Sequence, residues 1–278
     1  MVADSKRRFV GIAGVMVLLF TATVVQAQPP GPGGFGGPPA SARESAQVDL
    51  TGFWVAMVTE DWLWRMITAP RGDATSVPLN FQGQQVAGAW DPEADAASGE
   101  ACRPFGAAGL MRLPLRLRIR WEDDNTLKIE TDAGQQTRLL HFIDAVASER
   151  SWQGVTNAEW TTPVGGFDLR AVISGRVTQA PSGPPPGSLK AITTNLRAGY
   201  LRKNGLPYSE NAVLTEYFSR VSGFGNDYLT VLTIVHDPMY LNEDFVTSSH
   251  FKREQDDAGW NPTPCQTPPP LAAQESGQ

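Results

Sequence analysis

Apolar and charged residues alternate strictly from Leu115 to Trp121, where the sequence reads LRLRIRW. A period of two predicts a strand with one buried and one solvent-exposed face. The turn residues Asp123-Asp124-Asn125 follow, and residues 127–132 alternate again, so the two runs predict a β-hairpin. We interpret the charges of its outer face as an opposite-charge ladder in contact with water: Arg116, Arg118 and Arg120 against Lys128, Glu130 and Asp132.

Further runs of strand character follow, with turn residues between them. Residues 227–236 are rich in β-branched side chains and come after Gly225-Asn226, which is typical of a hairpin turn. Helical patterns are confined to residues 81–90 and to a short stretch at 93–99. The other predicted strands are 49–55, 136–142, 168–177, 188–195, 212–221 and 245–253. Eight or nine strands predict an all-β fold, a single antiparallel β-barrel with one or two short helices.

Three segments are too rich in Pro and Gly to bury apolar surface. Residues 28–47 begin QPPGPGGFGG and predict a disordered linker, and residues 266–278 predict a disordered tail. The run at 180–187 predicts a long surface loop within the fold, because the sequence on both sides predicts strands. The barrel domain is therefore expected to span residues 48–265.

The first 27 residues have the three-part pattern of a secretory signal peptide. Residues 6–8, KRR, precede an apolar run at 9–25, and small residues fit cleavage after Ala27. The alternative is an uncleaved segment kept as a membrane anchor. We expect a periplasmic or secreted protein, with no stable membrane span after cleavage. In that oxidising setting Cys102 and Cys265 predict one disulfide, with two free buried thiols as the alternative.

Charge and residue types exclude several classes of partner. The formal net charge is −6 and the arginines are scattered, so nucleic acid is excluded. The three His and two Cys have no zinc-motif spacing, and the sequence contains no phosphate-binding Gly-rich loop and no Gly-x-Ser-x-Gly motif. We therefore predict no metal and no cofactor.

The first predicted strand contains Gly52-Phe53-Trp54, which resembles the G-x-W signature of lipocalin-like (calycin) barrels. The resemblance implies a barrel closed at one end by Trp54, with an Arg or Lys of a late strand stacked on the indole as a cation–π contact. By position, Lys252, Arg253 or Arg220 would take that role. Barrels of about eight strands can hold one small ligand in their interior.

A second resemblance, to a set of secreted bacterial proteins without an assigned function, covers most of the predicted domain. The chain departs from their Trp-Glu-Gly-Asp run, because Trp160 is followed here by Thr161-Thr162-Pro163. This resemblance implies no activity. The residues that carry it are Cys102-x-x-Phe105-Gly106, Met111-Arg112-x-Pro114, residues 121–142, Ser188-Leu189-Lys190, Thr193-Thr194, Thr215-Glu216-Tyr217-Phe218 and Asp237-Pro238.

Two charged residues fall on the apolar face of a predicted strand. Glu216 shares a face with Leu214, and Arg138 shares one with Leu140. A buried charge without a partner is costly, so we expect Glu216 to meet an arginine. One interpretation is a structural ion pair that holds the barrel register. The other is a ligand anchor, in which Arg138 or Arg112 receives a carboxylate or carbonyl and Glu216 belongs to the same site.

The three histidines are His141, His236 and His250. A His beside a carboxylate in a barrel mouth could act as a general acid or base, although an ordinary hydrogen-bonded His is the simpler interpretation of each. Glu60 and Glu210 are the first carboxylates to consider for that chemistry, with burial raising their pKa as the required property.

Aromatic residues stand beside these carboxylates. Trp62 and Trp64 follow Glu60, and Tyr200 and Tyr208 flank a polar loop before a predicted strand. Aromatic side chains line pockets for flat or apolar ligands, and they equally fill cores and barrel ends, so both interpretations stay open.

Three functions fit this sequence. The first is an exported barrel that binds a small apolar or aromatic molecule in its interior. The second is a cofactor-free lyase, isomerase or hydrolase that uses a cavity carboxylate or His with an Arg that stabilises developing charge. The third is an envelope-associated protein-interaction module. A titratable pair at the cavity floor would favour the second over the first.

Overall fold

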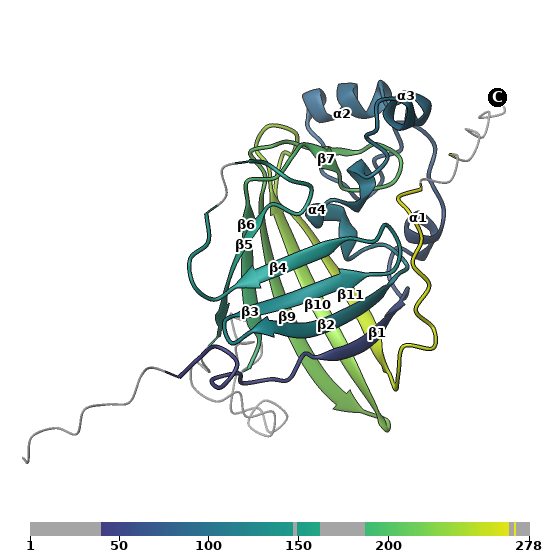
Figure 1. Cartoon of the computed structure of the whole chain (residues 1–278). Coiled ribbons are helices and arrows are strands. Elements are labelled where there is room, and N and C mark those ends of the chain that lie inside the picture. Colours follow the sequence, from purple (N-terminus) through teal and green to yellow (C-terminus); the bar gives the residue numbers. More distant parts are fainter. Residues whose placement is uncertain (1–39, 147–148, 162–186, 267–269, 271–278) are drawn as a thin grey trace, which may run out of the picture. The chain divides into compact units, whose positions relative to one another are not determined.

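The computed structural model describes residues 40–146, 149–161, 187–266 and 270. In this part of the chain nine strands close into a barrel in the order β1-β11-β10-β9-β6-β5-β4-β3-β2 (Figure 1), which confirms the predicted all-β single barrel. Neighbours are antiparallel except for β4 and β5, which run parallel. The strands are β1 Gly52–Met57, β2 Arg116–Asp123, β3 Thr126–Thr131, β4 Thr137–His141, β5 Val155–Trp160, β6 Leu189–Thr194, β9 Val213–Gly223, β10 Asn226–His236 and β11 Phe245–Glu254.

The predicted hairpins form, although the β9–β10 turn lies at Phe224-Gly225, one residue before the predicted Gly225-Asn226. In β2–β3, Arg118 lies opposite Glu130, with 2.9 Å between Nε and Oε2, so the charged ladder of the outer wall is confirmed. In β9–β10, the two turn residues Phe224 and Gly225 have φ angles of 51° and 73°. Positive φ at both turn positions gives a two-residue turn whose twist matches that of the strands.

Strand β5 was not predicted from the sequence. Its residues VTNAEW direct Thr156 and Ala158 inward, which are too weakly apolar to produce a clear alternation. The predicted strand at 168–177 and the breaker run at 180–186 lie outside the described residues, as do the predicted signal peptide and nearly all of the predicted tail.

The inward side chains of the strands form one hydrophobic cluster. Trp54, Leu117, Phe218 and Phe251 are fully buried in it, together with Leu and Ile side chains of β2 and β3. The strands therefore stabilise one another mainly by burying these alternate positions around the barrel interior.

Short helices and a small sheet cover one end of the barrel, where β10 ends and β11 begins (Figure 1). They carry a second hydrophobic cluster that includes Leu79, Leu201 and Leu206 and reaches Val235 and Phe245 of the barrel. The predicted helices are confirmed as α2 and α3, but more short helices form than expected. The covering elements are α1 Trp62–Met66, α2 Phe81–Gly88, α3 Pro92–Ala97, η1 Arg103–Phe105, α4 Ala107–Leu110, β7 Gly199–Tyr200 and β8 Pro207–Tyr208.

Trp54 lies at the opposite end of the barrel and is fully buried. Its indole Nε1 donates to the carbonyl of Leu50 over 3.0 Å. Of the three cations considered for its face, Arg253 makes the contact, with its guanidinium carbon 5.7 Å from the ring centroid. Arg220 instead pairs with Asp227. This end is therefore closed by an indole under a guanidinium group.

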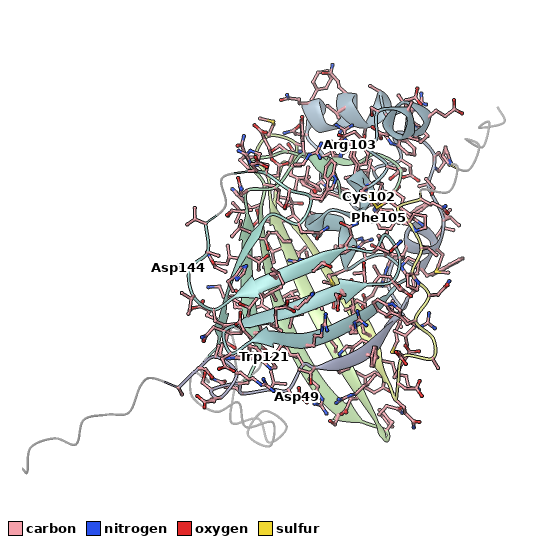
Figure 2. All side chains as sticks on the ribbon, in the orientation of Figure 1. Asp49, Cys102, Arg103, Phe105, Trp121 and Asp144 are labelled. Carbon is pink, nitrogen blue, oxygen red and sulfur yellow. A yellow bond between two sulfur atoms is a disulfide. The ribbon has the colours of Figure 1, made fainter. Side chains whose placement is uncertain are left out.

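Part of the predicted linker packs against the barrel. Ala42 is buried, and its carbonyl accepts a 2.8 Å hydrogen bond from the Trp160 indole, so residues 40–47 pack on the barrel rather than belonging to the linker. Cys102 and Cys265 form the predicted disulfide, which ties the C-terminal segment to η1 (Figure 2). Among the described residues, no helix has the length and apolar character to cross a membrane.

Candidate functional site

Four cationic side chains gather at the helix-covered end of the barrel. Arg65 comes from α1, Arg112 follows α4, and Arg202 and Lys203 lie in the turn between β7 and β8. All four are buried, with exposed fractions of 3% for Arg65, 7% for Arg112, 5% for Arg202 and 8% for Lys203. We call these residues the cationic cluster.

Asp61 supplies a single carboxylate to the cluster. Its Oδ2 lies 2.8 Å from Nη2 of Arg112 and 3.9 Å from Nη2 of Arg202, so only Arg112 is hydrogen-bonded to it. Arg65 donates from Nε to the backbone carbonyl of Arg112 over 2.7 Å. The cluster therefore holds more positive charge than its own carboxylate balances.

Two guanidinium groups keep nitrogens without an acceptor. Among the described residues, Nη1 and Nη2 of Arg65 and all three side-chain nitrogens of Arg202 have no hydrogen-bond partner. Burial, and then the charge of Arg112, lower the pKa of Arg65 to about 10, and the same two causes lower that of Arg202 to about 10. Burial also lowers the pKa of Lys203. Both arginines nevertheless stay charged near neutral pH.

A small cavity opens between these side chains. Its volume is about 10 Å³, and Trp64, Leu113 and Leu201 line it together with the cationic cluster. That space suits about one water-sized group. The guanidinium carbon of Arg202 lies 5.9 Å from the Trp64 ring, so an aromatic face forms part of the same wall.

The local sequence explains how α1 presents Arg65. Asp61 takes a left-handed conformation with φ 49° immediately before the helix, and the five residues WLWRM form little more than one turn. Arg65 and Asp61 contribute to the cluster, while Trp62, Leu63 and Met66 are exposed by 62%, 36% and 52%. An apolar surface therefore stands beside a buried cationic cavity on one short helix.

Of the predicted ligand anchors, Arg112 lies in the cationic cluster. Trp64, which was predicted as an aromatic residue of a ligand pocket, lines the cavity. Arg138 and Glu216, in contrast, form a buried ion pair inside the barrel, with 2.5 Å between Nη2 and Oε2. Arg138 also donates to Thr193 Oγ1 over 3.2 Å. The expected arginine partner of Glu216 is thus Arg138, and this geometry fits the structural interpretation of the pair.

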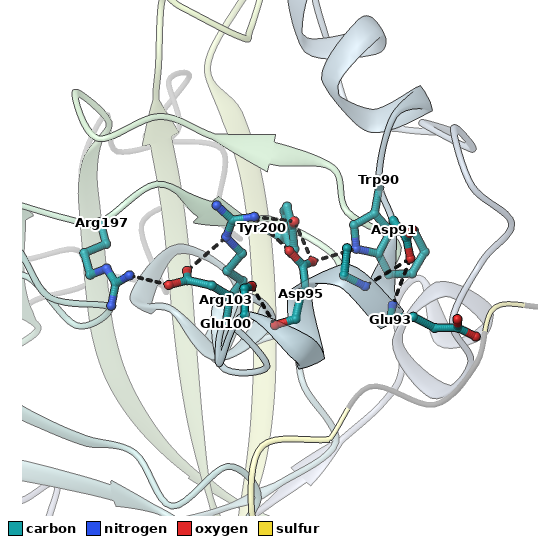
Figure 3. A network of polar contacts seen from close by, with 10 residues as sticks. Trp90, Asp91, Glu93, Asp95, Glu100, Arg103, Arg197 and Tyr200 are labelled. Carbon is teal, nitrogen blue, oxygen red and sulfur yellow. Dashed lines mark hydrogen bonds and ion pairs between the residues drawn. The ribbon is translucent and has the colours of Figure 1, made fainter.

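Tyr200 belongs to a polar network that joins α3 to β7 (Figure 3). Its hydroxyl donates to Oδ2 of Asp95 over 2.7 Å, and Arg103 bridges both residues. Burial and the hydrogen bond to Asp95 raise the pKa of Tyr200. Glu100 extends the network by pairing with Arg103 and with Arg197. These contacts assign Tyr200 a role in holding the cover together.

Tyr208 is completely buried in the second hydrophobic cluster, and its hydroxyl has no hydrogen-bond partner among the described residues. Burial raises its pKa. Its ring lies so close to Gly106 and Gly199 that a Cβ at either position would meet the hydroxyl, at 2.1 Å and 2.5 Å respectively. Tyr208 therefore fills the cover and does not line the cationic cavity.

One of the carboxylate–histidine pairs considered for catalysis does form. Oε1 of Glu60 lies 2.7 Å from Nε2 of His250. Because Ser249 and Phe251 point inward on β11, His250 faces outward, and neither it nor Glu60 lines the cationic cavity. The pair predicted as a sign of catalysis thus lies on the outer wall.

The other candidate acids and bases are dispersed. His236 pairs with Asp244 on the surface, and Glu210 pairs with Arg150 with its side chain 57% exposed. His141 ends β4 and lines a separate surface groove of about 460 Å³. Among the described residues, no group of three or more His, Cys, Asp or Glu could hold a metal ion.

Sequence reasoning missed Arg65, Arg202 and Lys203. The available signal was local: Arg65 stands within WLWRM, and Arg202-Lys203 directly follow Leu201 ahead of an Asn-Gly turn. A charged residue within an apolar stretch of sequence needs a partner for its charge, as was inferred for Glu216. Comparisons of the chain with protein-family models, with curated proteins and with solved structures found no match.

Proposed function

We propose that the protein is an exported small-molecule-binding barrel whose ligand is an organic acid, held by its acidic group in the cationic cluster. The observation that carries this proposal is the pair of buried guanidinium groups on Arg65 and Arg202. Two nitrogens of Arg65 and all three of Arg202 lack a hydrogen-bond partner among the described residues. An anion between them accepts these bonds and balances their charge. Arginine provides this arrangement for carboxylates and phosphates.

The surface beside the cluster supports an apolar or aromatic body for the same ligand. The cavity of about 10 Å³ has room for about one water-sized group, so an acidic group enters only as the arginine side chains shift apart, and the rest of the molecule lies outside. Trp62, Leu63 and Met66 are exposed there on α1. These exposed side chains support a ligand position at the covered end, whereas large side chains such as Phe218 and Phe251 occupy the interior that the sequence suggested for it.

Two further observations support the proposed location of the protein and its proposed relation to lipocalin-like barrels. The Cys102–Cys265 disulfide is the form expected of cysteines in a periplasmic or secreted protein. The contact of Arg253 with Trp54 supports a relation to lipocalin-like barrels, because the G-x-W resemblance implies such a contact. Both the location and the relation are part of the proposal.

Isothermal titration calorimetry with 2-naphthoate and its neutral amide tests the proposal. The two molecules share an aromatic body and differ in charge. We expect the acid to bind at least about ten-fold more tightly, because a charge-assisted hydrogen bond contributes about 1.5–3 kcal/mol. Equal affinity of the two molecules would refute an acid-binding cluster, and no binding of either would refute a cluster that accepts monocarboxylates.

Matched variants locate the binding. Arg65→Gln should weaken the acid at least about ten-fold and leave the amide unchanged. Arg120→Gln is the control, because Arg120 lies on the outer wall with half of its side chain exposed. Trp62→Ala should weaken both molecules a few-fold, and Phe81→Ala on α2, where Phe81 is 75% exposed, should weaken neither.

A further inference from the structure

We infer that the acidic group for which the cationic cluster is built is a phosphoryl dianion, as inorganic phosphate or as the head of a phosphate monoester. The inference rests on the proposed function and narrows its ligand class. Three features of the cluster carry it: the balance of charge, the number of unpartnered donors and the size of the cavity.

The charge balance favours a ligand with two negative charges. Asp61 is hydrogen-bonded to Arg112 over 2.8 Å, whereas Arg65 and Arg202 have no hydrogen-bonded carboxylate. Arg202 has only a 3.9 Å ion pair with Asp61, and Glu60 and Asp73 act on Arg65 and Arg202 respectively through their charge alone, so a dianion balances the buried charge of the cluster more fully than a monocarboxylate does. Because an unbalanced buried charge is costly, the cluster discriminates by the charge of its ligand.

The donors and the space favour a single compact group over two separate carboxylates. Arg65 offers Nη1 and Nη2, and Arg202 offers Nε, Nη1 and Nη2. The three terminal oxygens of a phosphoryl group give each guanidinium fork a pair of acceptors, with one oxygen shared. A cavity of about 10 Å³ has no room for two acidic groups, and a phosphoryl group itself enters only as the long arginine side chains shift apart.

The pH dependence of phosphate affinity gives the test. A phosphate monoester loses its second proton at a pKa of about 6, so its dianionic fraction rises about ten-fold from pH 5 to pH 7.5. Arg65 and Arg202 stay protonated in this interval, since their pKa is about 10. The other charged groups near these two arginines are Asp61, Asp73, Glu60, Arg112 and Lys203. His250 pairs with Glu60.

Sulfate separates titration of the ligand from titration of the protein. It is a dianion at both pH values, so any change in protein charge, including that of His250, alters sulfate affinity and can be subtracted. We therefore propose calorimetric titrations of the full chain with inorganic phosphate, phenyl phosphate, sulfate and benzoate at pH 5 and pH 7.5. The expected result is about a ten-fold rise for phenyl phosphate and a larger rise for inorganic phosphate, which loses its second proton at a higher pH, with little change for sulfate or benzoate.

Each outcome decides between the proposals. Phosphate that binds equally at both pH values, or benzoate that binds more tightly than either phosphate, overturns the dianion inference and leaves the proposed function standing. Failure of all four to bind overturns both. Tighter binding of phenyl phosphate assigns the site to esters, and equal or tighter binding of inorganic phosphate assigns it to the free ion; either result supports the inference.

Variants of Arg202 complete the test. Arg202→Gln should lower phosphate affinity at pH 7.5 at least ten-fold and remove most of the pH dependence, because one of the two unbalanced charges is gone. Arg202→Lys keeps the charge without the fork and should retain the pH dependence at lower affinity. Arg120→Gln should behave as wild type. Unchanged phosphate binding in well-folded Arg202→Gln would overturn the inference.

Discussion

Arg202 should destabilise the unliganded protein, so replacing it should stabilise the fold. Folding moves its guanidinium group from water to a site where 5% of the residue stays exposed and none of its nitrogens has a hydrogen-bond partner among the described residues. Burial and the charge of Arg112 lower its pKa to about 10, well below the ordinary value of an arginine. At about 1.4 kcal/mol for each unit, the charged form costs about 3 kcal/mol on folding. Arg202→Met removes the charge and keeps the apolar stem, and should raise the free energy of unfolding by about 1–3 kcal/mol.

The effect of Arg202 on the free energy of unfolding depends on pH. Below pH 10 the guanidinium is protonated in both the folded and the unfolded state, so the full cost is present at pH 7. Above about pH 10 the unfolded chain binds the proton more strongly than the folded protein does, so the stability of the wild type rises with pH and the difference in stability between it and Arg202→Met becomes smaller. The predicted difference is therefore largest near neutrality.

Urea unfolding at pH 7, followed by tryptophan fluorescence, measures the effect. The buffer should contain no phosphate or sulfate, because an anion in the cluster would offset the cost. Arg120→Met on the outer wall is the control and should change the free energy of unfolding by less than about 1 kcal/mol. A well-folded Arg202→Met that is less stable than wild type would refute the reasoning, since it would mean that Arg202 gains more from the fold than it loses.

Three further stability predictions follow from the same structure. Arg138→Met and Glu216→Gln should each cost about 3–5 kcal/mol in urea unfolding, because each leaves a buried partner unpaired, whereas the double variant should cost less than either single one. Reducing the Cys102–Cys265 disulfide, which closes a separation of 163 residues, should cost about 2–5 kcal/mol, seen as a lower urea midpoint in dithiothreitol. Gly205→Ala should lower the melting temperature by several degrees, since φ is +80° and a Cβ would lie 2.1 Å from a tryptophan side chain. For each of these three changes, an unchanged unfolding midpoint would contradict the contact on which the prediction rests.

The barrel was predictable because its signal is local. Residues 115–121 alternate apolar and charged side chains, and this period alone fixes which face turns inward. Strand β5 escaped prediction because its inward residues include Thr156 and Ala158, and its parallel pairing with β4 is fixed by barrel closure rather than by its own sequence. Helix α1 escaped because five residues are too few to show a helical period.

The cationic cluster was only partly predictable, because contacts distant in sequence assemble it. Arg65 reaches the backbone of Arg112, 47 positions later, and Arg202 comes from a turn between two short strands. Sequence reasoning identified Arg112 as a ligand anchor but had no measure of the burial of the others. What it had established was the principle that decides the matter: a charge within an apolar setting needs a partner.

The two buried arginine sites of this protein apply that principle in opposite ways. Inside the barrel, Glu216 neutralises Arg138 and Thr193 accepts a further bond, so among the described residues only Nε of this arginine lacks a hydrogen-bond partner and its charge is balanced without a ligand. At the covered end, Asp61 satisfies one of three arginines. The first arrangement stabilises the fold without a ligand, and the second reaches full pairing only when an anion arrives. A site whose charges are balanced by its ligand binds that ligand tightly, and the bound ligand in turn stabilises the fold. At a ligand concentration of one hundred times the dissociation constant, the free energy of unfolding rises by about 2.7 kcal/mol.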